Sequence, residues 1–127
     1  MVYTRSRTEK LGVKPGSRVA LVGLEDAPFV NELKAAGAQV AGRPGAGPYD
    51  MMIVGLRAPS DLPSLVEAKK RIVRNGMIWA VWPKGRKEFR EDDIRHFGPQ
   101  AGLVDVKVMS FSDELSGLKL VIPLAQR

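Results

Sequence analysis

Apolar residues are grouped along this chain in short runs that end at glycine or proline, which is the pattern of buried strands joined by turns. Residues 18–22 form the first run, which ends at Gly23. Residues 51–56 and 77–82 form two further runs that are almost continuously apolar. Such runs are typical of central strands in a parallel sheet, because both faces of these strands are covered. The chain therefore predicts three core strands.

Helical signals lie before and after the first of these strands. Residues 4–11 predict a short polar helix, which the glycines and proline of residues 12–16 end. After the strand, Asp26 is a predicted N-cap with Pro28 in the first turn, and apolar residues then recur at helical spacing. This helix is expected to stop at Gly37 and to lead into a second, short strand over residues 38–41.

A longer helix is predicted between the second and third core strands. It is expected to begin at a cap formed by Ser60 or Asp61 and to end at Asn75-Gly76. The apolar face of this predicted helix consists of Leu62, Leu65, Val66, Ile72 and Val73.

The last third of the chain predicts one more helix and a hairpin. An acidic start favours a helix over residues 90–97, which Gly98-Pro99 is expected to cut short. Apolar and polar residues alternate over 104–108 and again over 118–122, which predicts an antiparallel hairpin at one edge of the sheet. Strands that alternate with helices in this order predict an α/β fold with a largely parallel sheet.

Size and composition fit one folded domain over residues 1–127. The chain is 44% hydrophobic and 27% charged, which is ordinary for a folded protein. No run approaches the roughly 18 apolar residues that span a bilayer, and residues 1–10 lack the apolar segment of a signal peptide. We therefore expect a cytoplasmic domain with no membrane partner. With no cysteine and one histidine, His96, the chain predicts no metal site.

Four segments resemble, in their order, class I S-adenosylmethionine-dependent methyltransferases. They are the strand that ends at Gly23, Tyr49-Asp50 before an apolar strand, the turn and strand over residues 74–79, and the final hairpin. The resemblance covers residues 14–123. It implies a three-layer, Rossmann-like sheet that is mostly parallel and carries a C-terminal antiparallel hairpin.

Within that superfamily, residues 10–16, 82–85 and 102–107 look most like a small bacterial family of methyltransferase-like domains of unknown function. The chain is also shorter than the superfamily pattern. Eight residues separate Ala41 from Asp50, so the superfamily's third strand and the helix beside it have no room. We therefore expect that third strand to be missing.

The positions that hold the cofactor in the superfamily differ in this chain. The superfamily's first loop carries two or three glycines, whereas here residues 24–26 (Leu-Glu-Asp) follow Gly23. An acidic residue normally ends the second strand and binds the ribose hydroxyls, whereas here Val40 is followed by Ala41. Residues 55–57 (Gly-Leu-Arg) stand where many members place a polar catalytic motif. The chain therefore predicts no cofactor and no catalytic residue.

Two predicted turns at the carboxyl edge of the sheet carry basic residues. Arg57 follows the second core strand, and Lys84 and Arg86 follow the third. In an open parallel sheet both turns emerge beside Gly23, at the edge where ligands bind. Converging cations favour phosphate or carboxylate over a sulfonium cofactor with a net positive charge. The candidate anion-binding residues are Arg57, Lys84 and Arg86, and the candidate pocket-lining residues are Gly23, Glu25 and Trp82.

Simpler interpretations of these charges stay open. The cations could be solvated loop charges, or Glu25 and Asp26 could pair with Arg57 or Lys84 and close the mouth of the site. The 20 basic and 14 acidic residues give a formal charge of +6, with basic residues concentrated at 69–74. We interpret this excess as a solvated face, with a nucleic-acid footprint as the alternative.

The leading hypothesis is a non-catalytic methyltransferase-like domain that binds an anionic ligand or a protein partner. Loss of the superfamily's third strand leaves the second strand at an open sheet edge, which invites pairing with another chain and makes a homodimer a reasonable expectation. The alternatives are a divergent S-adenosylmethionine-dependent methyltransferase completed by a partner subunit, and a nucleic-acid-binding module.

Overall fold

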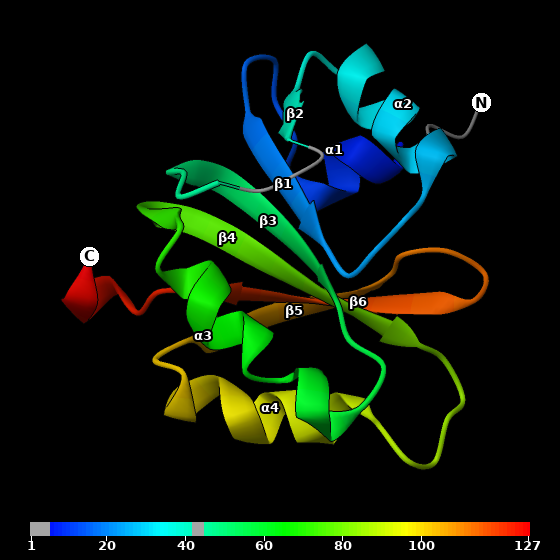
Figure 1. Cartoon of the computed structure of the whole chain (residues 1–127), viewed down its shortest axis with the longest axis vertical. Helices are drawn as coiled ribbons and strands as arrows, with labels where there is room; N and C mark the ends of the chain where they lie inside the picture. Colours follow the sequence, from blue (N-terminus) through cyan, green and yellow to red (C-terminus); the bar gives the residue numbers. More distant parts are fainter. Residues whose placement is uncertain (1–5, 42–44) are drawn as a thin grey trace, which may run out of the picture.

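Six strands form one sheet in the order β2-β1-β3-β4-β6-β5 in the computed structural model, which describes residues 6–41 and 45–127 (Figure 1). The first four strands in this order are parallel, and β4, β6 and β5 pair antiparallel. The strands are β1 (Arg18–Val22), β2 (Gln39–Ala41), β3 (Tyr49–Gly55), β4 (Ile72–Pro83), β5 (Val104–Ser110) and β6 (Leu115–Val121).

Two layers of helices cover the sheet, with α1 and α2 on one face and α3 and α4 on the other (Figure 1). Because alternate residues of a strand point to opposite faces, Met51 and Ile53 pack on the α1–α2 side, while Met52 and Val54 pack on the α3–α4 side. The predicted three-layer α/β fold is confirmed. The helices are α1 (Arg7–Leu11), α2 (Ala27–Ala35), α3 (Ser64–Lys69) and α4 (Glu91–Gln100), with 3-10 turns η1 (Pro59–Asp61) and η2 (Leu124–Gln126).

No helix in the described part of the chain is both long enough and apolar enough to cross a membrane.

The first strand and the helix after it form as predicted. β1 has the predicted bounds, and the carboxylate of Asp26 accepts a hydrogen bond from the Phe29 N–H at 3.0 Å, which caps α2. Pro28 lies in the first turn, where its missing N–H costs no helical bond. Gly37 follows the end of α2 with a φ of 89°, a conformation that favours glycine.

The long helix predicted between Ser60 or Asp61 and Asn75-Gly76 is wrong. Here η1 and the short α3 are followed by β4, which begins at Ile72. The backbone of this segment pairs with β3 instead of continuing a helix, since Ile72 is the ladder partner of Tyr49. Gly76 also lies so close to β3 that an added Cβ would be 3.0 Å from the Asp50 carbonyl oxygen. The apolar residues at 72 and 73 therefore belong to a strand that starts five residues earlier than the apolar run.

The prediction that Gly98-Pro99 cuts the last helix short is also wrong, because α4 continues to Gln100. The stop comes at Gly102, whose φ of 74° is left-handed. The Gly102 N–H donates to the Pro99 carbonyl at 3.0 Å and the Leu103 N–H donates to the Gly98 carbonyl at 2.9 Å, which together form a Schellman cap. Gly98 itself is buried, so its small size serves packing.

The two edges of the sheet are β2 and β5. The hairpin of β5 and β6 is antiparallel and lies at one edge, as predicted. At the other edge, β2 has three residues and pairs with β1 alone among the described strands. The predicted loss of the superfamily's third strand is therefore confirmed, since β2 stands outermost where that strand would otherwise pair.

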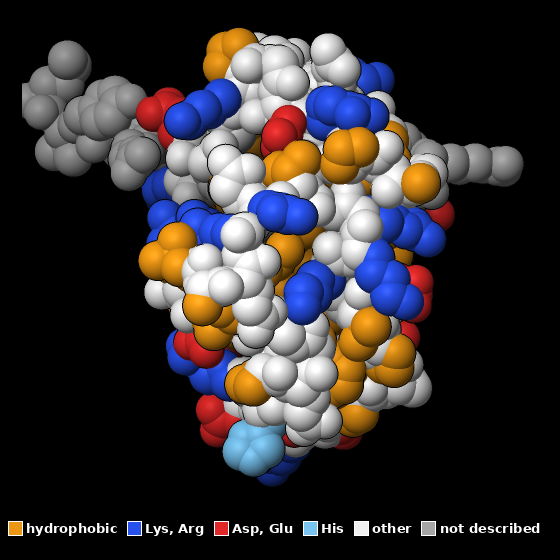
Figure 2. Space-filling view, turned by 90° about the vertical axis from the view of Figure 1, so that its left-hand side faces the viewer, with side chains coloured by type: hydrophobic (Ala, Val, Ile, Leu, Met, Phe, Trp, Pro, Cys, Tyr) orange, Lys and Arg blue, Asp and Glu red, His pale blue; other side chains and the backbone are white. Residues whose placement is uncertain are grey.

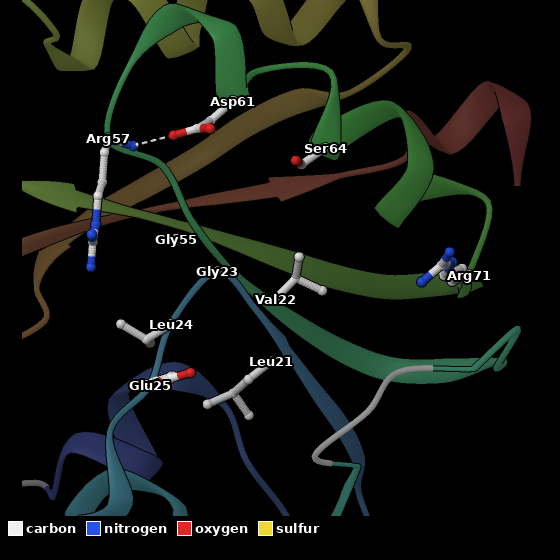
Figure 3. A pocket seen from close by; sticks show the side chains of 10 residues that line it. All are labelled: Leu21, Val22, Gly23, Leu24, Glu25, Gly55, Arg57, Asp61, Ser64 and Arg71. Atoms are coloured by element: carbon white, nitrogen blue, oxygen red, sulfur yellow. Dashed lines mark hydrogen bonds between the residues drawn. The ribbon is translucent and has the colours of Figure 1, made fainter.

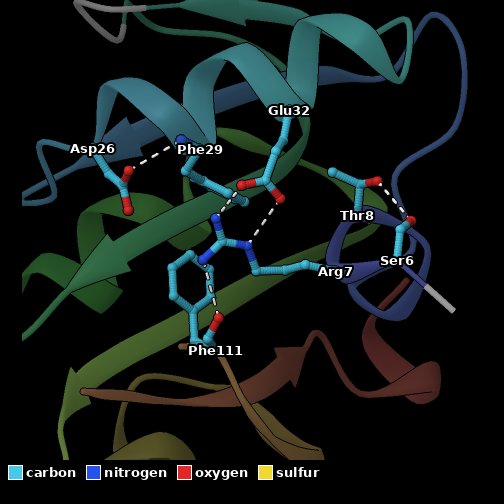
Figure 4. Close-up of polar contacts among 7 residues, drawn as sticks. All are labelled: Ser6, Arg7, Thr8, Asp26, Phe29, Glu32 and Phe111. Carbon is cyan, nitrogen blue, oxygen red and sulfur yellow. Dashed lines mark hydrogen bonds and ion pairs between the residues drawn. The ribbon is translucent and has the colours of Figure 1, made fainter. Parts of the chain in front are cut away.

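Arg7 fastens α1 to the rest of the fold (Figure 4). Its guanidinium donates to the carboxylate of Glu32 through Nε and Nη2, with Nε to Oε1 at 3.1 Å, and its Nη1 donates to the Phe111 carbonyl at 3.1 Å. The same guanidinium lies over the rings of Phe29 and Phe111, 4.7 and 4.8 Å from their centroids. One side chain thus ties α1, α2 and the β5–β6 turn together by charge-assisted and cation–π contacts.

Candidate functional site

The carboxyl ends of β1 and β3 meet at a backbone contact between Gly23 and Gly55. A Cβ on Gly55 would lie 2.3 Å from the Gly23 carbonyl oxygen, and a Cβ on Gly23 would lie 2.8 Å from the Gly55 carbonyl oxygen. Beyond this contact the chain runs from β1 to α2 on one face and from β3 to η1 on the other. Such a divergence of neighbouring strands is where open α/β sheets bind ligands.

A groove of about 1040 Å³ opens at this point and runs between β1 and α3 (Figure 3). Gly23, Glu25 and Arg57 line it at the carboxyl edge, Ser64 lines it on α3, and Arg71 lies at its far end. A smaller hollow of about 320 Å³ adjoins this groove, and Gly23, Glu25 and Arg57 line both. The structure thus brings three of the six predicted site residues, Gly23, Glu25 and Arg57, to one place.

Arg57 offers a guanidinium without an ion-pair partner among the described residues. The nearby Asp61 is occupied by the backbone, because its Oδ2 accepts hydrogen bonds from the N–H groups of Arg57 at 2.9 Å and Ala58 at 3.3 Å. Asp26 is likewise occupied by its capping bond to α2. The alternative in which Glu25 or Asp26 pairs with Arg57 or Lys84 is therefore not what the structure has.

Arg71 is a residue of this groove that the sequence did not reveal. The sequence predicts a solvated basic run over residues 69–74 inside a long helix, whereas Arg71 lies between the end of α3 and the start of β4. The Tyr49 N–H donates to its carbonyl at 2.8 Å, which ties this junction to the start of β3. The half-buried side chain forms no ion pair with any described residue and faces the groove from the end opposite to Arg57 (Figure 3).

The other three predicted site residues lie elsewhere. Lys84 is exposed, and its Nζ donates to the Ser110 hydroxyl of β5 at 2.6 Å. Arg86 and Trp82 line a separate hollow of about 330 Å³ beyond β4. Trp82 is 5% exposed and packs in the core on the α3–α4 side, so it contributes only a buried ring to that hollow. The predicted anion and pocket roles of these residues stay predictions.

The groove contains groups that can bind a charged ligand and form hydrogen bonds with it. It offers the Arg57 and Arg71 guanidinium groups, the Ser64 hydroxyl and the Glu25 carboxylate. Within the described residues no three His, Asp or Glu side chains gather closely enough to hold a metal ion, and His96 is exposed on α4. At the end of β2, Ala41 offers no carboxylate to a ribose.

The fold is that of class I S-adenosylmethionine-dependent methyltransferases. A TehB-like S-adenosylmethionine-dependent methyltransferase from Corynebacterium glutamicum superposes with a TM-score of 0.71 at 12% identity, over 92% of this chain and 86% of that one. An S-adenosylmethionine-dependent methyltransferase from Aquifex aeolicus gives 0.70 at 12% identity, over 91% and 87%. A ribosomal protein L11 methylase from Lactobacillus delbrueckii gives 0.69 at 13%, over 91% and 74%.

No family model and no curated protein sequence matches the chain. At these identities the likeness establishes the fold.

Proposed function

We propose that this chain is a non-catalytic methyltransferase-like domain that binds an elongated anionic ligand in the groove between β1 and α3. The observation that carries the proposal is the turn after β1. Gly23 is its one glycine and is held against Gly55, and the next residues are Leu24, Glu25 and Asp26. A turn that carries side chains keeps its backbone N–H groups away from a cofactor that needs close approach.

Two of the four charged side chains that line the groove, Arg57 and Arg71, support an anion. Arg57 and Arg71 are guanidinium groups without carboxylate partners among the described residues, and a guanidinium binds phosphate or carboxylate in a bidentate manner. S-adenosylmethionine carries a net positive charge, so both side chains disfavour it. The carboxylate that would accept its ribose hydroxyls is replaced by Ala41 at the end of β2.

The spacing of the two arginines supports an elongated ligand. Tyr49 at the start of β3 pairs with Ile72, next to Arg71, and Gly55 at the end of β3 lies two residues before Arg57. A strand rises about 3.3 Å per residue, so the two backbone positions are roughly 20 Å or more apart. A small anion can reach one arginine, whereas a long polyanion can reach both.

Binding of inorganic tripolyphosphate, compared with inorganic phosphate, tests the proposal by thermal shift. A ligand at a hundred times its dissociation constant stabilises a protein by about 2.7 kcal/mol, which is readily measured. We expect Arg57→Ala to abolish the shift with both probes, because Arg57 anchors one end of either. We expect Arg71→Ala to weaken the shift with tripolyphosphate and to spare the shift with phosphate.

Lys10→Ala is the matched control, because it removes one positive charge from the exposed surface of α1, away from the groove. Equal losses in Arg57→Ala and Lys10→Ala would reject the groove as the site. Arg86→Ala is expected to leave both shifts unchanged, since Arg86 lines a different hollow.

A divergent S-adenosylmethionine-dependent methyltransferase is the second candidate, and the likeness to methyltransferase structures over nine tenths of this chain favours it. The two candidates differ in one simple measurement. Our proposal expects no thermal stabilisation by S-adenosylmethionine or by its demethylated product. A concentration-dependent shift with either compound would support the enzyme instead.

A further inference from the structure

A second basic surface lies on the β5–β6 hairpin, away from the groove. Lys107 and Lys119 are direct partners in the antiparallel ladder, so their side chains project from the same face. Lys119 also pairs with Trp79 of β4, whose ring is buried on the α1–α2 side. Both lysines therefore project from the α1–α2 face of the sheet.

Helices α1 and α2 leave this end of the hairpin uncovered. Near the β5–β6 turn, Phe111 is buried and Met109 packs against the α1–α2 core. At the other end Lys107 is exposed, Lys119 is half-buried, and Val104 is 42% exposed. The face thus changes from a packed core to an open strand surface along the length of one hairpin.

A third cation joins the two lysines. The Nε of Arg127 donates to the Ile122 carbonyl at 2.8 Å, which places this residue beside the end of β6. Burial lowers the pKa of Lys119, and the positive charges of Lys107 and Arg127 lower it further. None of these three side chains forms an ion pair with a residue in the described ranges. The two lysines are ladder partners, so their positive charges lie close together and repel each other.

We infer that Lys107, Lys119 and Arg127 form a surface that binds the phosphate backbone of a nucleic acid. Repulsion among these like charges raises the free energy of the unbound domain. Binding to several neighbouring phosphates of one nucleic-acid strand relieves this repulsion. The surface spreads over two strands and the residue after η2, which fits an extended polyanion better than a small ion.

The exposed side chains around the cations indicate contact with the backbone and not with the bases. The large hydrophobic side chains exposed on the described residues are three valines of β5 and Leu124, and none of them is aromatic. Stacking of bases needs aromatic platforms, and these side chains offer none, so we expect the contacts to be made with phosphate groups. In Figure 2, which faces the side where the C-terminus lies, basic side chains surround apolar ones across the middle of the molecule.

Fluorescence anisotropy with a labelled single-stranded DNA of about 20 nucleotides tests this inference. The full chain should bind at low salt, and the logarithm of its affinity should fall linearly with the logarithm of the salt concentration. Each phosphate contact contributes about 0.7 to that slope for a single strand, so the triple variant Lys107→Gln, Lys119→Gln, Arg127→Gln should lower the slope by about 2. Its affinity at about 50 mM salt should fall about tenfold or more.

The matched control is Lys14→Gln, Lys34→Gln, Lys87→Gln, which removes the same charge from three exposed lysines outside β5 and β6, none of which forms an ion pair with a described residue. It should keep most of the affinity and slope, and far-UV circular dichroism checks that both variants are folded. An equal loss in the two triple variants would overturn the inference, because total charge would then account for binding. Association of the unaltered chain with anionic phospholipid vesicles but not with the oligonucleotide would also overturn it.

Discussion

Replacement of Trp79 by alanine is expected to destabilise the chain by about 3–5 kcal/mol, the usual range for deleting a buried tryptophan side chain. Trp79 is fully buried, and its indole N–H donates to the carbonyl of Leu11 at 3.0 Å. A Cβ on Gly117 would lie 3.3 Å from the same ring, so β6 packs closely against it as well. The substitution removes the contact that joins β4, β6 and the end of α1.

Chemical denaturation followed by circular dichroism measures this effect. Trp79→Phe keeps an aromatic ring and leaves the buried Leu11 carbonyl without its donor, so we expect a smaller loss of about 1–3 kcal/mol. If Trp79→Ala costs less than Trp79→Phe, the ring does not join these elements as described.

The second large effect is expected for Gly55→Ala, at about 1–3 kcal/mol with loss of anion binding in the groove. The added Cβ would meet the Gly23 carbonyl oxygen at 2.3 Å and the Gly23 carbonyl carbon at 2.9 Å. Both atoms belong to backbone, so the two loops must move apart. That movement displaces Glu25 and Arg57, which line the groove on either side of the contact.

Gly45→Ala is the matched control for this substitution. A Cβ on Gly45 would meet the Tyr49 hydroxyl at 3.9 Å, which is an ordinary contact, and Gly45 is exposed and has no positive φ. Denaturation midpoints and tripolyphosphate binding should therefore be nearly unchanged in Gly45→Ala. Equal destabilisation of the two variants would contradict a specific contact between the loops.

Local signals in the sequence predicted much of the fold. The bounds of β1, the Asp26 cap of α2 and the antiparallel hairpin followed from apolar runs, capping chemistry and alternation, all of which act between near neighbours in the chain. The two errors came where a distant partner decided the outcome. Ile72 joins a strand because Tyr49 offers it a backbone partner, and α4 runs past Pro99 to a cap at Gly102.

The candidate site was predictable only at the carboxyl edge of the sheet. Parallel strands bring their following turns to one edge, which is why Gly23, Glu25 and Arg57 were expected together and do line one groove. Arg71 enters the groove from the amino end of β4, and its place depends on where α3 ends. No local pattern marked that end, because the apolar residues that follow fitted a longer helix equally well.

Our proposal separates likeness of fold from likeness of site. The fold is that of the methyltransferases, whereas the positions that the sequence resemblance assigns to the cofactor carry Leu24, Glu25 and Ala41. Fold is maintained by the buried faces of the strands, and function depends on a few residues at their ends. The proposal for this domain therefore depends on the residues at the edge of the sheet.

Amide chemical shifts of Gly23, Leu24 and Glu25 during titration with S-adenosylmethionine test the central claim most directly, since these amides form the turn that a bound cofactor would contact. We predict no change at these three amides with S-adenosylmethionine, and clear changes there and at Arg57 with tripolyphosphate. Saturable shifts of the three amides with S-adenosylmethionine would contradict the account and identify the turn as a working cofactor site.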